Sequence, residues 1–259
     1  MSGRVALVTG AARGIGAAVT RLLVGEGYRV VALDWCAGDS SPLPYPMARR
    51  ADLDDLVASL PADTIIPWVG DVRDPAVLTG AVAAAVGTWG RLDVAVAGAA
   101  VMAGGAPLWE DDSLALQWAI DVEGVWHTAS AAIPAMLAGP DPSGCRFVAV
   151  ASAAGTRGLF RLAAYTTVKH AVVGLVRGLA QDLVGTGVTA VAVAPGSTDT
   201  AMLRATAEVY ATTTDELAGH QLLQRALAPD EVAATIAFCC SPAGAALNGS
   251  VVSADGGFS

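Results

Sequence analysis

The sequence is poor in lysine, asparagine and histidine. Its 259 residues include a single lysine, Lys169, and a single asparagine, Asn248, beside 14 arginines and three histidines. Acidic residues outnumber basic ones by 24 to 15, and the net charge of −9 argues against nucleic acid or an anionic membrane surface as a partner. Arginine supplies the other permanent positive charges, so the one ammonium is distinctive. It offers a compact point charge with three donors instead of a planar fork.

Cysteine is also scarce, and its spacing excludes the common metal motifs. The four cysteines show neither a CxxC pair nor a nearby pair of histidines, which predicts free thiols in a reducing cytosol and no metal site: Cys36, Cys145, Cys239 and Cys240. The chain enters an apolar run at once, which predicts no signal peptide. Turn residues interrupt the uncharged stretch at 232–254, which predicts no membrane span. We therefore expect a cytoplasmic protein.

Short apolar runs alternate with longer helical patterns along the chain. Strands are expected at 4–9, 29–33, 64–69, 92–97, 147–151, 188–194 and 250–253, and helices at 14–25, 52–60, 74–89, 111–137, 163–184 and 229–239. This alternation predicts an α/β fold of one domain, residues 1–259: a Rossmann-type, doubly wound parallel sheet with its ligand at the carboxyl ends of the strands. Residues 200–225 are expected to form a small helical lid, although a peripheral helix pair has the same pattern.

Three glycines after the first predicted strand have the spacing of a dinucleotide-binding loop. Gly10, Gly14 and Gly16 let the backbone approach a pyrophosphate at a helix N-terminus, although a plain tight turn has a similar composition. Asp34 ends the second strand, where a carboxylate accepts a ribose 2′-hydroxyl and repels a 2′-phosphate. The sequence therefore favours NAD over NADP. Asp71, after the third strand, is expected either to contact the adenine or to cap a helix.

The connection at residues 35–50, called the insert below, is long for a strand-to-helix loop. It contains three prolines and one glycine. Its apolar side chains Trp35, Tyr45 and Met47 favour a loop packed beside the cofactor ribose. A disordered surface insert is the alternative.

Tyr165 and Lys169 have the spacing of an acid–base pair on a helix. Four residues apart, both side chains lie on one helix face, and an adjacent cation lowers the pKa of a phenol so that it can exchange protons. Ser152 follows the predicted strand at 147–151 and is expected to point toward the same helix. An ordinary exposed helix pair and a strand-end serine have the same spacing.

Together these residues resemble the short-chain dehydrogenase/reductase family over the whole chain. The resemblance implies that Ser152 orients the substrate oxygen, that Tyr165 exchanges its proton, and that Lys169 lowers the tyrosine pKa and binds the nicotinamide ribose of NAD. It assigns cofactor contacts to Gly10, Arg13, Gly14, Ile15, Gly16, Asp34, Trp35, Asp71, Val72, Ala97, Gly98, Ala99, Tyr165, Lys169, Pro195, Gly196, Thr198 and Thr200. It also implies a homotetramer that uses the largely apolar helices at 111–137 and 163–184.

Two positions depart from the family pattern. Residues 95–98 read Ala-Val-Ala-Gly where the family has Asn-Asn-Ala-Gly, and Asp121 replaces an asparagine that helps to hold a water in a proton relay. An ionised carboxylate accepts hydrogen bonds but cannot donate them. Asp121 is therefore a candidate catalytic residue, and Asp121→Asn is expected to be at least as active as the wild type.

The insert, the loop at 104–109 and the segments around Tyr165 and Thr200 resemble the mycofactocin-coupled, carveol-dehydrogenase-like subgroup. This resemblance implies a small apolar alcohol or ketone as substrate, an insert that retains NAD through turnover, and a mycofactocin-type redox carrier as partner. Two alternatives stay open: a 3-oxoacyl-carrier-protein-type ketoreductase, and a non-catalytic NAD-binding regulatory protein. Asp34 argues against the first, which is expected to prefer NADP, and the Ser152, Tyr165 and Lys169 set argues against the second.

Overall fold

The computed structural model describes residues 3–43 and 45–258. In these residues seven strands form one sheet, all in parallel register, in the order β3-β2-β1-β4-β5-β6-β7. The strands are β1 Val5–Thr9, β2 Arg29–Asp34, β3 Ile65–Val69, β4 Val94–Ala97, β5 Arg146–Val150, β6 Thr189–Pro195 and β7 Val251–Ala254. The order reverses between β1 and β4, which confirms the predicted Rossmann-type sheet.

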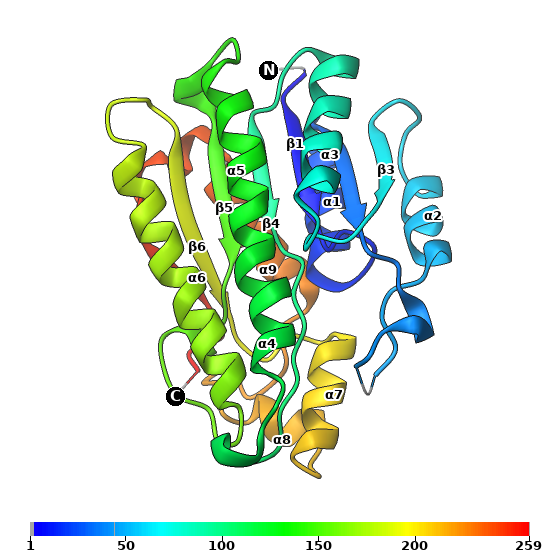
Figure 1. Cartoon of the computed structure of the whole chain (residues 1–259), viewed down its shortest axis with the longest axis vertical. Coiled ribbons are helices and arrows are strands. Elements are labelled where there is room, and N and C mark those ends of the chain that lie inside the picture. The colour runs from blue at the N-terminus through cyan, green and yellow to red at the C-terminus, as the bar shows by residue number, and fades with distance from the viewer. Residues whose placement is uncertain (1–2, 44, 259) are drawn as a thin grey trace.

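Helices cover both faces of the sheet (Figure 1). They are α1 Gly14–Gly25, α2 Arg50–Ala58, α3 Pro75–Trp89, α4 Leu114–Gln117, α5 Gly124–Leu137, α6 Ala163–Asp182, α7 Ala201–Val209, α8 Thr214–Ala218 and α9 Pro229–Cys240. Successive side chains of a strand point to opposite faces. Leu7 therefore packs with α3, α5 and α6, whereas its neighbour Val8 packs with α1, α2 and α9. Burial on both faces explains why the strands are continuous apolar runs.

The helix predicted at 111–137 is interrupted where the family departure occurs. Between α4 and α5 the segment Trp118–Glu123 is a π-helix, and Asp121 lies within it with no exposed surface. Such a π-helical turn contains an extra residue and is frequent at functional sites. The periodicity of the sequence did not predict this local change, which re-aims the side chains around residue 121.

The predicted lid contains α7 and α8, which lie at the carboxyl ends of the strands, at the lower edge of the molecule in Figure 1. Thr200 caps α7, since its Oγ1 accepts a hydrogen bond from Leu203 N at 3.4 Å. The lid therefore begins beside the segment that follows β6, and it covers the end of the sheet where a ligand is expected.

Candidate active site

A cavity of about 660 Å³ lies at the carboxyl ends of the strands. This volume is within the range of about 300–1,000 Å³ that is usual for small-molecule and cofactor sites. Every residue assigned to the site from the sequence lines this cavity except Ala97, which is buried in β4, and Asp121, which is buried behind Lys169.

The glycine loop forms one wall because side chains are excluded there. A Cβ at Gly16 would lie 2.0 Å from Gly10 O, and one at Gly10 would lie 2.8 Å from Ala99 Cα. Gly10 and Gly14 also have φ values of +70° and +55°, which disfavour other residues. The loop therefore keeps bare backbone at the start of α1, where N–H groups suit a phosphate.

Asp34 connects the end of β2 to the glycine loop. Its Oδ2 accepts from Ala12 N at 3.0 Å and its Oδ1 from Cys36 N at 3.0 Å. A carboxylate can accept about four hydrogen bonds, so acceptor capacity remains on the cavity side. No cation pairs with Asp34 in the described residues, whose ion pairs all lie elsewhere.

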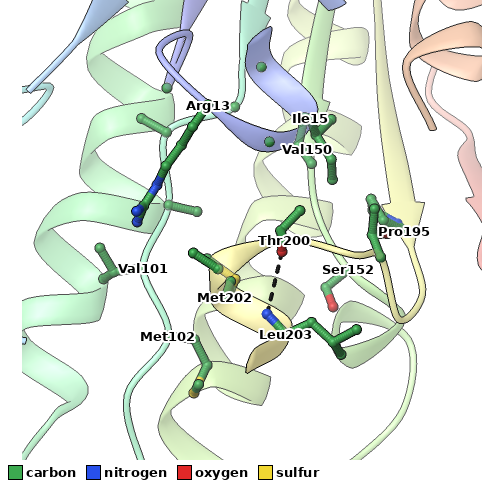
Figure 2. Close-up of a pocket in the computed structure, with 18 of the residues that line it drawn as sticks. Arg13, Ile15, Val101, Met102, Val150, Ser152, Pro195, Thr200, Met202 and Leu203 are labelled. Carbon is green, nitrogen blue, oxygen red and sulfur yellow. Dashed lines mark hydrogen bonds between the residues drawn. The ribbon is translucent and has the colours of Figure 1, made fainter. Parts of the chain in front are cut away.

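In its described residues the insert is an ordered loop that packs against the rest of the protein, and not a disordered one. Tyr45 is buried, and its hydroxyl accepts from Met102 N at 2.9 Å, beyond the end of β4. From the glycine loop, Arg13 donates to Pro46 O at 2.8 Å and lies 3.7 Å from Met47 Sδ. The insert therefore joins two walls of the cavity, and Figure 2 shows Arg13 extending along one side with Pro195 and Ser152 on the other.

Asp71 is already engaged by a neighbouring side chain. Both of its oxygens accept from Arg73, through the backbone N at 2.9 Å and through Nε and Nη2 at 2.8 and 2.5 Å. The Arg73 guanidinium in turn lies 4.8 Å from the centre of the Trp35 ring. Asp71 and Trp35 still line the cavity, and the contact of Arg73 with the Trp35 ring was not predicted from the sequence.

The loop after β4 is fixed by Thr9. Gly98 N and Ala99 N both donate to Thr9 Oγ1, at 3.1 and 3.2 Å. Pro195 and Gly196 follow on the far wall, where Gly196 packs so tightly that a Cβ would lie 2.2 Å from Gln221 Oε1. The Thr9 hydroxyl therefore holds the loop after β4 without the family's two asparagines, and the Gln221 side chain leaves no room for a larger residue at position 196.

Ser152, Tyr165 and Lys169 meet at the deep end of the cavity. Ser152 follows β5 and caps a short 3-10 turn, accepting from Ala154 N at 3.1 Å. Tyr165 and Lys169 come from the first turns of α6, and Lys169 Nζ lies 5.5 Å from the centre of the Tyr165 ring. Tyr165 and Lys169 are 8% and 2% exposed, so the ordinary exposed helix pair is excluded.

Lys169 is paired with Asp121. Its Nζ lies 3.1 Å from Asp121 Oδ2 and 3.4 Å from Val150 O. Burial lowers the pKa of Lys169, but Asp121 and Tyr165 outweigh burial and the net shift is upward. The ammonium therefore stays charged in the wall of the cavity.

Lys169 affects the Tyr165 pKa in the expected direction, but burial opposes it and the net shift is upward. Burial raises the pKa of Tyr165 and is the largest influence; Lys169 lowers it, Asp121 raises it, and the interaction with the Ser152 hydroxyl lowers it. Lys169 acts in the predicted direction, but burial and the neighbouring carboxylate outweigh it. The sequence did not predict that Asp121 opposes the effect of Lys169 on Tyr165.

The cavity wall beside the Tyr165 hydroxyl is apolar. Met202 of α7 lies with its Sδ 3.9 Å from the Tyr165 hydroxyl, and it lies with Met102 and Leu203 around the cavity in Figure 2. Further apolar side chains on this wall, none of them assigned from the sequence, are Leu159, Leu162 and Phe258. Their apolar character was visible in the sequence, but their position depends on which loops meet at the sheet edge.

Residues 3–43 and 45–258 contain neither a candidate membrane span nor a candidate metal site. No helix there combines the length and apolarity needed to cross a membrane, and no group of three or more histidine, cysteine, aspartate or glutamate side chains is arranged to hold a metal ion.

Comparison with known proteins identifies the family. A family model described as enoyl-(acyl carrier protein) reductase matches residues 10–259. The chain belongs to the short-chain dehydrogenase/reductase family. It is 36% identical to (−)-trans-carveol dehydrogenase of Rhodococcus erythropolis, over 79% of this chain and 74% of that protein.

Two further relatives cover nearly the whole chain. An NAD-dependent oxidoreductase of Mycobacterium tuberculosis is 34% identical over 99% of this chain and 96% of its own. The crystal structure of carveol dehydrogenase from Mycobacterium avium in complex with NAD superposes with a TM-score of 0.90 and 29% identity, over 99% of this chain and 98% of that one.

Proposed function

We propose that this protein is an NAD-dependent oxidoreductase that interconverts a small apolar secondary alcohol and its ketone. The observation that carries the proposal is the meeting of Ser152, Tyr165 and Lys169 with the glycine loop in one cavity. The carveol dehydrogenases among the similar proteins and the apolar substrate wall support an apolar alcohol.

The residues of the cavity fit NAD. Bare backbone at Gly10 and Gly16 suits the pyrophosphate. The Asp34 carboxylate suits ribose hydroxyls and disfavours a 2′-phosphate. Trp35 and Asp71 line the cavity and would lie beside the adenosine, and Lys169 would donate to the nicotinamide ribose.

When bound, NAD would accept the hydride from the alcohol carbon. Side chains of this protein would transfer the proton. Ser152 donates to the substrate oxygen and orients it. In oxidation the Tyr165 phenolate takes the hydroxyl proton, and in reduction the phenol returns it. Lys169 stabilises the phenolate by its charge. The apolar side chains Met102 and Met202 exclude water from the reacting carbon.

The insert supports retention of the cofactor. The insert is held by the hydrogen bond between Met102 N and the Tyr45 hydroxyl and by the one from Arg13 to Pro46 O. A dinucleotide covered by the insert can therefore leave only after these hydrogen bonds break. Bound NAD would then be regenerated in place by a separate redox carrier of the mycofactocin type, and not by exchange with free NAD.

A turnover assay tests the proposed function. The protein is assayed with cyclic secondary alcohols and an artificial electron acceptor, alone and with added NAD, and bound dinucleotide is quantified after denaturation. We expect bound NAD, turnover with the acceptor, and complete loss of turnover with retained NAD in Tyr165→Phe. No turnover with any alcohol, or a preference for NADPH and acyl-carrier-bound 3-oxoacyl substrates, would refute it.

Retention is tested separately from activity. Shortening residues 37–48 to a glycine linker, or Arg13→Ala, should speed exchange of bound NAD with labelled NAD. Arg49→Ala is the matched control, since its exposed pair with Asp39 lies within the insert and does not contact the glycine loop. Equal exchange rates in all four proteins would refute retention by the insert.

We also propose a homotetramer. Apolar side chains along α4, the π-helical segment and α5 remain exposed in the single chain: Leu114, Trp118, Trp126 and Leu137. Exposed apolar side chains of this kind suit pairing with the same helices of a second copy, and the family resemblance implies that two such pairs form a tetramer. A monomer in light scattering at micromolar concentration would contradict the proposal.

A further inference from the structure

Asp121 receives two donors from two different elements. Its Oδ1 accepts from Val101 N at 2.8 Å, beyond the end of β4, and its Oδ2 lies 3.1 Å from Lys169 Nζ on α6. The side chain has no exposed surface, and Oδ2 has no other partner among the described residues. The ammonium of the protein's single lysine thus lies 3.1 Å from a buried carboxylate oxygen and 5.5 Å from the centre of the Tyr165 ring.

Two acceptor oxygens are needed to satisfy this arrangement. An aspartate gives one oxygen to the Val101 N–H and one to the ammonium. An asparagine has a single carbonyl oxygen, and its NH2 group would face either the Val101 N–H or the Lys169 ammonium. The carboxylate is therefore matched to its surroundings and is not simply a degraded form of the family's asparagine.

We propose that Asp121 is the counter-ion of Lys169, a positioning residue that holds the ammonium beside Tyr165 and cancels part of its charge there. The proposal rests on the proposed function, in which Tyr165 exchanges the substrate proton. Its consequence is that Tyr165 keeps its proton to higher pH than it would beside an unpaired lysine. At neutral pH the residue is then prepared to donate to a carbonyl, and oxidation of an alcohol accelerates as the solution becomes alkaline.

The groups around Tyr165 give the sign of each change. Lys169 lowers the tyrosine pKa and Asp121 raises it, against a background that burial raises. The insert contributes Tyr45, a neutral phenol that Arg13 faces in turn. Ser152 and Met202, the other side chains at the hydroxyl, carry no charge. Removing the carboxylate charge should therefore lower the Tyr165 pKa, and removing the ammonium should raise it.

The test is a tyrosinate titration of the full-length protein by ultraviolet difference absorbance, without substrate. Each variant is compared with the same variant carrying Tyr165→Phe, so that only Tyr165 contributes to the difference. Asp121→Asn should titrate at lower pH than the wild type and Lys169→Gln at higher pH, each by at least about one pH unit. The double variant Asp121→Asn/Lys169→Gln should return close to the wild type, since it lacks both charges.

Asp93→Asn is the matched control. Asp93 is also buried, accepts a backbone N–H and pairs with a cation, but it lies at the opposite end of β4. Its variant should leave the Tyr165 titration unchanged. Circular dichroism checks that each variant folds. If Asp121→Asn does not fold, the double variant must still titrate at lower pH than Lys169→Gln.

Each remaining outcome decides against one proposal only. An unchanged Tyr165 titration in folded Asp121→Asn means that Asp121 carries no charge or acts only structurally, and it overturns the counter-ion role. The same shift in Asp93→Asn also overturns it, because the effect would not be local. Failure to turn over any alcohol would refute the proposed function and leave the order of the titrations untouched.

Discussion

Two similar ion pairs with different cations lie near the two ends of β4. At the amino end, Asp93 accepts from Val5 N at 2.8 Å and pairs with Arg91 through both oxygens, at 2.5 and 2.8 Å. Beyond the carboxyl end, Asp121 accepts from Val101 N and pairs with Lys169 at one oxygen. Both carboxylates are buried, but the Arg91 side chain is 28% exposed and that of Lys169 only 2%.

This difference in exposure and geometry suggests that the Arg91–Asp93 pair stabilises the fold, whereas the Lys169–Asp121 pair acts on the proposed reaction. The Arg91 guanidinium is permanently charged and binds both oxygens of Asp93. Asp93 in turn accepts from Val5 N, so this pair holds the start of β4 against β1. The Lys169 ammonium makes a single contact with Asp121 and a longer one with Val150 O, so one of its three N–H donors remains for another group. Asp34 completes the series: it also accepts two backbone N–H groups but pairs with no cation among the described residues, and it faces the cofactor end of the cavity.

Exchanging the cations should give the largest effect. Lys169→Arg is expected to reduce turnover by about a hundredfold or more, because a guanidinium fork does not fit the buried site between Asp121 and Tyr165. Arg91→Lys should leave turnover unchanged. Steady-state rates with an artificial acceptor measure both. Near-normal turnover in Lys169→Arg would remove the distinction between the two pairs.

Breaking the structural pair should affect stability alone. Asp93→Ala leaves Val5 N and Arg91 without their acceptor, at a cost of about 3 kcal/mol in the free energy of unfolding. Urea unfolding at neutral pH measures this loss. Turnover per folded molecule should stay at the wild-type value, and a parallel loss of turnover would show that the two ends of β4 are coupled.

The unpaired carboxylate should control cofactor choice. Asp34→Ser removes an anion that accepts ribose hydroxyls, so NAD affinity should fall by about tenfold or more, as for one charge-assisted hydrogen bond. NADP affinity should rise, because the repulsion of its 2′-phosphate is relieved. Calorimetric titration of dinucleotide-free protein measures both. Equal affinity of the wild type for NAD and NADP would show that Asp34 does not contact the ribose.

The smallest effect is expected at Tyr45, whose neutral hydroxyl accepts from Met102 N as the carboxylates accept from other backbone groups. Tyr45→Phe should cost about 1 kcal/mol in the free energy of unfolding at neutral pH, for one lost hydrogen bond. Burial raises the pKa of Tyr45 from 10.0 to about 12. The protonated hydroxyl therefore contributes to the stability of the folded state below pH 10, and this contribution is lost as the pH rises from 10 to 12.

The wild type should therefore lose its stability advantage over Tyr45→Phe as the pH rises from 10 to 12, and near pH 12 the variant should be the more stable protein. Unfolding free energies across this interval measure it. A constant difference would mean that the Tyr45 hydroxyl has the same pKa in the folded and unfolded chain.

The local features of this protein were predictable because they depend on spacing. The alternating apolar runs predicted the sheet and its helices, and four residues of helix place Tyr165 and Lys169 on one face. The glycine spacing after β1 predicted the bare loop, and Asp34 was expected at the end of β2, where it lies. These inferences needed only backbone geometry and the period of each element.

Tertiary structure alone determines which charged groups surround the Tyr165 hydroxyl. Asp121 and Lys169 are 48 positions apart, on elements that meet only when the π-helical segment packs against α6. The insert likewise reaches Met102 from 57 positions away. Sequence spacing determines which side chains share a face of one helix or strand. Whether a cation meets an anion depends on which faces are buried together, since only burial makes the pairing strong enough to change the pKa of Tyr165.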